Sequence, residues 1–77
     1  MKVQVNAFAN LRGYAPGGRG PGDLSLPDGA TAADLLDALR IPPTVQAVML
    51  VNGRRAEAAT LLHDGDDVTL FPPMEGG

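Results

Sequence analysis

The stretch DVTLFPPMEGG, residues 67–77, closes the sequence with an alternating apolar segment, two prolines and a glycine pair. The alternation through residues 67–71 predicts a half-buried β-strand. The prolines cannot donate to a sheet, so we expect the strand to end at Phe71 and a tail, residues 72–77, to leave it. Glycine lacks a Cβ, and the six extended residues of the tail reach at most ~20 Å, enough to enter a narrow cleft in a partner. We therefore expect residues 1–71 to form a folded domain that presents residues 72–77 as a flexible tail.

Composition limits the class of protein. A chain of 77 residues predicts one domain, and the lack of cysteine excludes a disulfide framework, a thiolate zinc site and a cysteine nucleophile. A net charge of −3, with one tyrosine and two phenylalanines, gives little support to nucleic-acid binding. The first residues, MKVQVNAF, do not form a signal peptide, and the longest apolar run, 47–51, is too short to span a membrane. We expect a cytoplasmic protein without a nucleic-acid or membrane partner.

The pattern of apolar and turn residues predicts an α+β roll. The expected elements are strands over 2–8, 23–27, 45–51 and 54–57, a loop over 13–22, a helix over 32–40, a helical turn over 58–62 and a turn over 63–66. The single helix must then cover one face of a four- to five-stranded mixed sheet, with the first and last strands parallel in its middle. Residues 45–51 are apolar on both faces, which predicts a strand either covered on both sides or facing a partner on one.

Local signals mark the ends of the helix and one hairpin. Thr31 is a favourable N-cap, and Asp34 three residues later predicts a weak capping box. Asp37 and Arg40 are spaced for an i,i+3 ion pair. Asn52-Gly53 is a strong signal for a two-residue hairpin turn.

Several polar residues have a simple structural explanation. His63, the single histidine, lies in a polar segment, and we favour a solvated turn over a ligand or pH-switch role. The neighbouring carboxylates of Asp64, Asp66 and Asp67 lack the spacing of a calcium loop, so we expect a turn and no metal site. Arg54-Arg55 is interpreted as a solvated hairpin tip, with contact to an acidic partner as the alternative.

The two phenylalanines are the candidates for a partner surface. If the first and last strands are adjacent, Phe8 and Phe71 share the sheet face away from the helix and lead to the tail. An exposed apolar patch at that place would mark a docking surface. The alternative is a small second cluster closed by loops of the chain itself.

Four segments of the sequence resemble the MoaD/ThiS family of β-grasp sulfur carriers, and most closely its molybdopterin synthase small-subunit branch. These segments are FANLR at 8–12, the helix at 31–39, VNG at 51–53 and DGDDVTLFPPMEGG at 64–77. The last segment is the most specific, because it joins the final strand to the Phe-Pro-Pro and Gly-Gly elements of the family ending. The resemblance implies a β-grasp, ubiquitin-like fold.

The resemblance also implies a mechanism. An E1-like adenylating enzyme of the MoeB/ThiF type would use ATP to activate the Gly77 carboxylate, and a persulfide donor would convert it to a thiocarboxylate. A large subunit of the MoaE type would receive the tail and pass sulfur to a pterin precursor in molybdenum or tungsten cofactor biosynthesis. The chain itself would be a non-catalytic sulfur donor that binds no cofactor stably. The tail residues that this implies for insertion are Pro72, Pro73, Met74, Glu75 and Gly76.

Other functions share the same features. A ubiquitin-like protein modifier needs the same Gly-Gly end and E1-like activation but forms an isopeptide bond to lysine. A sulfur carrier could instead serve thiamine synthesis or tRNA thiolation. A β-grasp interaction module with an incidental tail would keep its function without Gly76 and Gly77.

Overall fold

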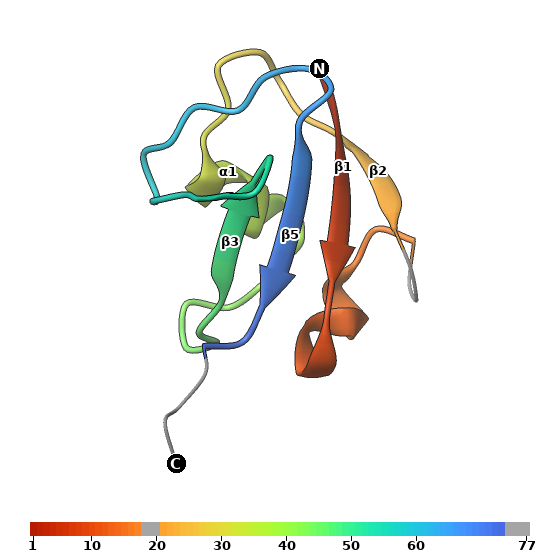
Figure 1. The fold of residues 1–77 in the computed structure, drawn as a ribbon, viewed down its shortest axis with the longest axis vertical. Coiled ribbons are helices and arrows are strands. Elements are labelled where there is room, and N and C mark those ends of the chain that lie inside the picture. The colour runs from red at the N-terminus through yellow and green to blue at the C-terminus, as the bar shows by residue number, and fades with distance from the viewer. Residues whose placement is uncertain (18–20, 74–77) are drawn as a thin grey trace.

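The chain folds into one five-stranded mixed sheet with a short α-helix packed on one face (Figure 1). The computed structural model describes residues 1–17 and 21–73. Its elements are β1 (Lys2–Ala7), the 3₁₀ helix η1 (Ala9–Tyr14), β2 (Gly22–Ser25), α1 (Ala32–Ala38), β3 (Val48–Val51), β4 (Arg54–Arg55) and β5 (Asp67–Phe71). The expected α+β roll with a single covering helix is confirmed.

The strand order is β2-β1-β5-β3-β4, with the first and last strands side by side in the centre. β1 and β5 run parallel, with Val5 opposite Val68, as predicted. β2 pairs antiparallel with β1, and β3 lies antiparallel to β5 on its other side. Because β5 is a central strand and the last one, the sheet holds the base of the tail on both flanks.

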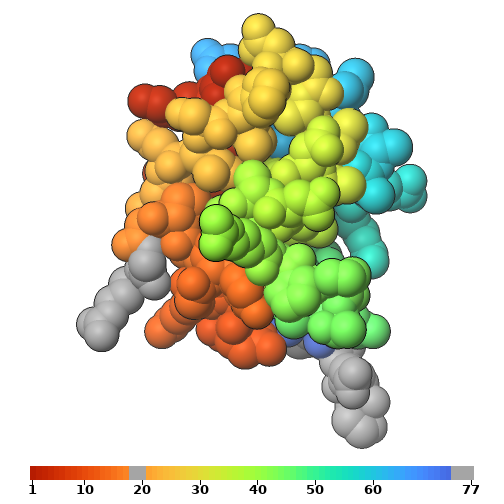
Figure 2. Space-filling model, turned by 180° about the vertical axis from the view of Figure 1, so that it is seen from behind, coloured from red at the N-terminus to blue at the C-terminus, as the bar shows by residue number. Residues whose placement is uncertain are grey.

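The core lies between the sheet and α1. Alternate residues of the central strands point toward the helix, and Val5, Val68 and Leu70 are completely buried there. Leu35 of α1 and Leu11 of η1 are equally buried against them. Figure 2 views the molecule from this side, where α1 and the segment after it cover the sheet. In a chain this small the one apolar layer supplies most of the stabilisation.

Helix α1 begins as predicted but ends two residues early. The Asp34 amide donates to Thr31 Oγ1 at 3.3 Å and the Thr31 amide donates to Asp34 Oδ2 at 2.9 Å, which completes the capping box. The helix ends at Ala38, and Arg40 adopts a left-handed φ of 61°. That turn takes Arg40 off the helical surface, so the expected Asp37–Arg40 ion pair is not formed within the described residues.

Three other predictions of local structure were wrong. Residues 9–14 form η1, where a strand end and the start of a loop were expected, because Leu11 is drawn into the core. β3 begins only at Val48, since the preceding residues turn back with the Val45 amide bonded to the Pro42 carbonyl at 2.9 Å. Residues 58–62 form no helical turn; Leu61 instead makes an extended β-bridge with Thr31.

The turn over residues 63–66 is confirmed, and its carboxylates bind backbone and side-chain amides. Asp64 Oδ1 accepts from the Lys2 amide at 2.7 Å. The buried Asp66 accepts from the His63 amide at 2.8 Å and from Asn52 Nδ2 at 2.9 Å. These bonds join the turn to β1 and to the β3–β4 hairpin. Over residues 1–17 and 21–73, no helix has the length and apolar character needed to cross a bilayer.

Candidate functional site at the tail end of the sheet

Three strands bring their ends together where the tail leaves the sheet (Figure 1). β5 ends at Phe71, which lies opposite Val48 at the start of β3. On the other side, the Phe8 amide donates to the Leu70 carbonyl at 2.9 Å, extending the β1–β5 pairing by one residue. The base of the tail is therefore held between two neighbouring strands in a fixed direction.

An apolar patch occupies the uncovered face of the sheet at this end. Strand alternation directs Leu70 and Met49 into the core, so their neighbours Phe71 and Val48 face the other way. The members of this open-face patch are Phe8, Val48, Leu50 and Phe71. Phe8 is 49% exposed, the other three are half-buried, and none of the four belongs to the core cluster or packs against it.

The structure decides two alternatives that the sequence left open. Phe8 and Phe71 share the face away from α1, and no loop in the described part of the chain closes over Phe8, which is one of its two exposed large apolar residues. The second apolar face of β3 is likewise uncovered, which adds Val48 and Leu50 to the patch. The signal for these two residues was present in the sequence, because a strand apolar on both faces in a chain with one helix leaves one face bare. Whether a partner binds the patch stays a prediction.

The tail begins beside a shallow hollow. Pro72 and Pro73 are half-buried and line this hollow of about 430 Å³. Its other walls come from η1 and from the segment before β3, through Asn10, Thr44, Val45 and Gln46. Three of the six lining residues are polar and three are apolar. The other predicted tail residues, Met74, Glu75, Gly76 and Gly77, lie outside the described residues.

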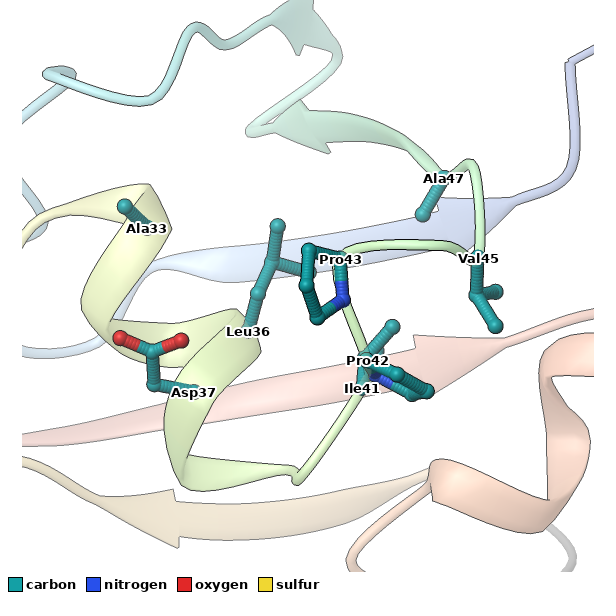
Figure 3. Close-up of a pocket in the computed structure, with 8 residues that line it drawn as sticks. All are labelled: Ala33, Leu36, Asp37, Ile41, Pro42, Pro43, Val45 and Ala47. Atoms are coloured by element: carbon teal, nitrogen blue, oxygen red, sulfur yellow. The ribbon is translucent and has the colours of Figure 1, made fainter.

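A second hollow opens on the helix side of the molecule (Figure 3). It has a volume of about 280 Å³ and lies between α1 and the segment that leads to β3. Seven of its eight lining residues are apolar, and the eighth is Asp37. Residues proposed for the tail chemistry do not line it, so it forms no part of the candidate site.

Other polar residues do not converge on the site. His63 lies in the turn before β5, with Nδ1 4.0 Å from Asp66 Oδ2 and its side chain 78% exposed. Over the described ranges, no three His, Asp or Glu side chains gather as ligands for a metal ion. The described residues therefore offer a base held by two strands and an apolar surface at the start of the tail.

Comparisons with known proteins agree with this arrangement. The profile of the ThiS family matches residues 5–77. SAMP1 from Haloferax volcanii is 27% identical, with each chain covered completely and a TM-score of 0.78. A putative molybdopterin converting factor subunit 1 from Pyrococcus furiosus is 30% identical over 96% of this chain and 99% of that chain, with a TM-score of 0.79.

A further structure shows the fold alone. It is a complex of subunits 1 and 2 of the molybdopterin-converting factor from Helicobacter pylori, in which the matched chain is 21% identical over 100% of both chains, with a TM-score of 0.64. None of the curated proteins compared with the chain matches it. Together the structural likenesses confirm the ubiquitin-like β-grasp roll.

Proposed function

The chain belongs to the ThiS family of ubiquitin-fold sulfur carriers, as its motifs indicated, and from this we propose that the Gly77 carboxylate carries sulfur as a thiocarboxylate. The observation that carries the proposal is the family match through residue 77, which includes the Gly-Gly end. The structure supports it by fixing the base of that tail on a central strand beside an apolar surface.

Activation must come from a partner, because an ionised carboxylate is a poor electrophile. In the proposed route the Gly77 carboxylate attacks the α-phosphorus of ATP on an E1-like enzyme of the MoeB/ThiF type, releasing pyrophosphate. Hydrosulfide, or a persulfide followed by thiol reduction, then displaces AMP and leaves the thiocarboxylate. The chain supplies only the acyl group and its delivery, and it holds no cofactor of its own. Because the proposed activation consumes ATP, we expect this chemistry to take place in the cytoplasm.

The open-face patch is the proposed docking surface for these partners. A partner that covers Phe8 and Phe71 would meet the tail directly at its base, so burial of the patch would also direct the tail into the partner's cleft. Apolar anchors of this kind commonly carry most of the binding free energy of an interface. The rigid sheet between patch and tail lowers the entropy cost of delivering the carboxylate.

We place the chain most specifically as the small subunit of molybdopterin synthase, acting with a large subunit of the MoaE type. The Phe-Pro-Pro segment at 71–73 and the 30% identity to the Pyrococcus protein support this branch. In the Helicobacter protein, subunits 1 and 2 of the converting factor form a complex, which gives a precedent for this pairing. Thiamine synthesis and tRNA thiolation are the other destinations for sulfur from a carrier of this family.

Intact-mass measurement tests the carrier function. We expect incubation with a MoeB-type enzyme, ATP and sulfide to raise the mass by the exchange of one oxygen for sulfur. Deletion of Gly77 should prevent the change, while the folded domain stays intact. Absence of both adenylate and thiocarboxylate with every activating enzyme tried would overturn the proposal.

A protein modifier is the second candidate, and the likeness to SAMP1, whose name denotes a small archaeal modifier protein, favours it. The modifier would share the adenylate but pass its acyl group to a lysine amine. A ladder of covalent conjugates in cells, lost on deletion of Gly77, would favour this candidate. Thiocarboxylate formation without conjugates would favour the carrier.

A further inference from the structure

A second exposed surface lies at the end of the sheet opposite the tail. The described residues contain two exposed large apolar side chains, and they occupy different ends of the molecule. Phe8 belongs to the open-face patch, whereas Leu61 lies beside the β3–β4 hairpin and is 56% exposed. We name the surface around it, formed by Arg54, Arg55, Leu61 and His63, the β4 corner. These residues line a hollow of about 400 Å³.

The backbone that presents Leu61 is firmly held. The Ala32 amide donates to the Thr60 carbonyl at 2.9 Å, and the Leu62 amide donates to the Ala30 carbonyl at 2.9 Å, on either side of Leu61. This bridge geometry is extended, so adjacent side chains point in opposite directions. Leu62 is 3% exposed and fills the core, which forces Leu61 outward. Leu61 is thus a fixed apolar side chain and not part of a loosely attached loop.

The charge of the corner is opposite to that of the whole protein. The chain carries a net charge of −3, yet the hollow beside Leu61 is lined by two of its six Lys and Arg residues and by one carboxylate, that of Asp66. Across the described part of the chain, the ion pairs involve neither Arg54 nor Arg55. The carboxylate of Asp66 in this lining already accepts from the His63 amide and from Asn52 Nδ2. The guanidinium groups are therefore available to carboxylates of another molecule.

We propose that the β4 corner binds an acidic peptide segment of a partner protein that inserts one apolar side chain against Leu61. Because adjacent strand residues point in opposite directions, Arg54 and Arg55 would pair with carboxylates on either side of the bound segment. A nucleic acid fits less well, since the lining of this hollow includes no Phe, Tyr or Trp for base stacking and the protein as a whole is acidic. The corner adjoins the start of β5, whereas the tail leaves from its end, and Arg55 lies directly opposite Leu50, where the corner meets the open-face patch. This inference does not depend on the sulfur-carrier function.

Amide chemical shifts of the full chain can test the proposal with a defined probe. The probe is a short synthetic peptide in which glutamate alternates with leucine, and its matched control replaces each glutamate with lysine. We expect the acidic peptide to shift the amides of residues 54, 55 and 60–63, and the lysine peptide to leave them unchanged. Arg54→Glu should raise the dissociation constant of the acidic peptide at least about fivefold, and Leu61→Ser should have the same effect. Arg40→Glu makes the same change of charge outside the corner and should leave binding unchanged.

Three results would overturn the proposal. The first is no shift at the corner, or equal shifts with both peptides. The second is a larger change in the chemical shifts of the corner amides with a single-stranded oligonucleotide than with the acidic peptide. The third is a dependence of these shifts on protein concentration alone, which would assign the surface to a second copy of the chain. An unchanged melting temperature in Arg54→Glu would show that the variant is folded, so that weaker binding reports on the corner itself.

Discussion

Replacing Phe8 by alanine separates docking from folding. Phe8 is 49% exposed, so the chain's own fold buries about half of its side chain. Complete burial of a phenylalanine is worth about 1.5–3 kcal/mol, which leaves about 1 kcal/mol to be gained when a partner covers the remainder. A central anchor in an interface can contribute about 2 kcal/mol. The dissociation constant for the activating enzyme should therefore rise about 5- to 30-fold.

Phe8→Ala should destabilise the fold less than a substitution in the core does. Val5 lies in β1, just before Phe8, on the opposite face of the sheet and with no exposed surface, and Val5→Ala should cost about 2 kcal/mol. For a domain of this size, that cost lowers the melting temperature by about 10 °C, whereas loss of the half-buried Phe8 side chain, worth about 1 kcal/mol, should lower it by about 5 °C. Calorimetric titration with a MoeB-type enzyme and thermal unfolding measure the two effects. Unchanged affinity in Phe8→Ala would refute the docking role, and equal loss of melting temperature in both variants would make Phe8 a core residue.

Three further predictions concern the scaffold. Asn52→Gly keeps the left-handed turn but removes the side-chain hydrogen bonds to Asp66 and to the Asp67 amide. We expect the free energy of unfolding in urea to fall by about 1–3 kcal/mol. A fall below about 0.5 kcal/mol would show that these bonds do not stabilise the hairpin. Arg40→Gly should raise the melting temperature by a few degrees, because φ is 61° at this position and glycine adopts it without strain; a lower melting temperature would contradict this. Thr31→Ala should lower the free energy of unfolding by about 1 kcal/mol because it removes the helix cap, whereas Thr31→Ser should keep most of that stability. Equal stability of the two variants would exclude a contribution from the cap hydrogen bond.

The elements predicted from sequence succeeded where their signals are local. The alternation of residues 67–71, the Thr31 cap and the Asn52-Gly53 turn each depend on neighbours within a few positions, and all three are present. The predictions failed where distant contacts decide the backbone. Leu11 draws residues 9–14 into a 3₁₀ helix, although the glycine and proline content nearby predicts a loop.

The candidate site shows the same division. The terminal Gly-Gly pair, the prolines and the two phenylalanines could be identified from sequence because their chemistry and spacing are distinctive. The contributions of Val48 and Leu50 could not be fixed in advance, since strand alternation gives two faces without saying which one the helix covers. Likewise, adjacent Leu61 and Leu62 are equivalent in sequence, and only the bridge to Thr31 determines which of them is buried.

Local patterns in the chain were enough to specify a small α+β domain whose last strand leads into a Gly-Gly tail, because strand alternation, helix capping and proline geometry act over a few residues. Which apolar residues stay exposed depends instead on how the elements pack in three dimensions. One helix covers only one face of a five-stranded sheet, so the opposite face keeps its apolar residues at the base of the tail. The hydrogen bonds that hold residues 60–62 fix Leu61 at the other end by the same rule: in an extended segment, only every second side chain can reach the core.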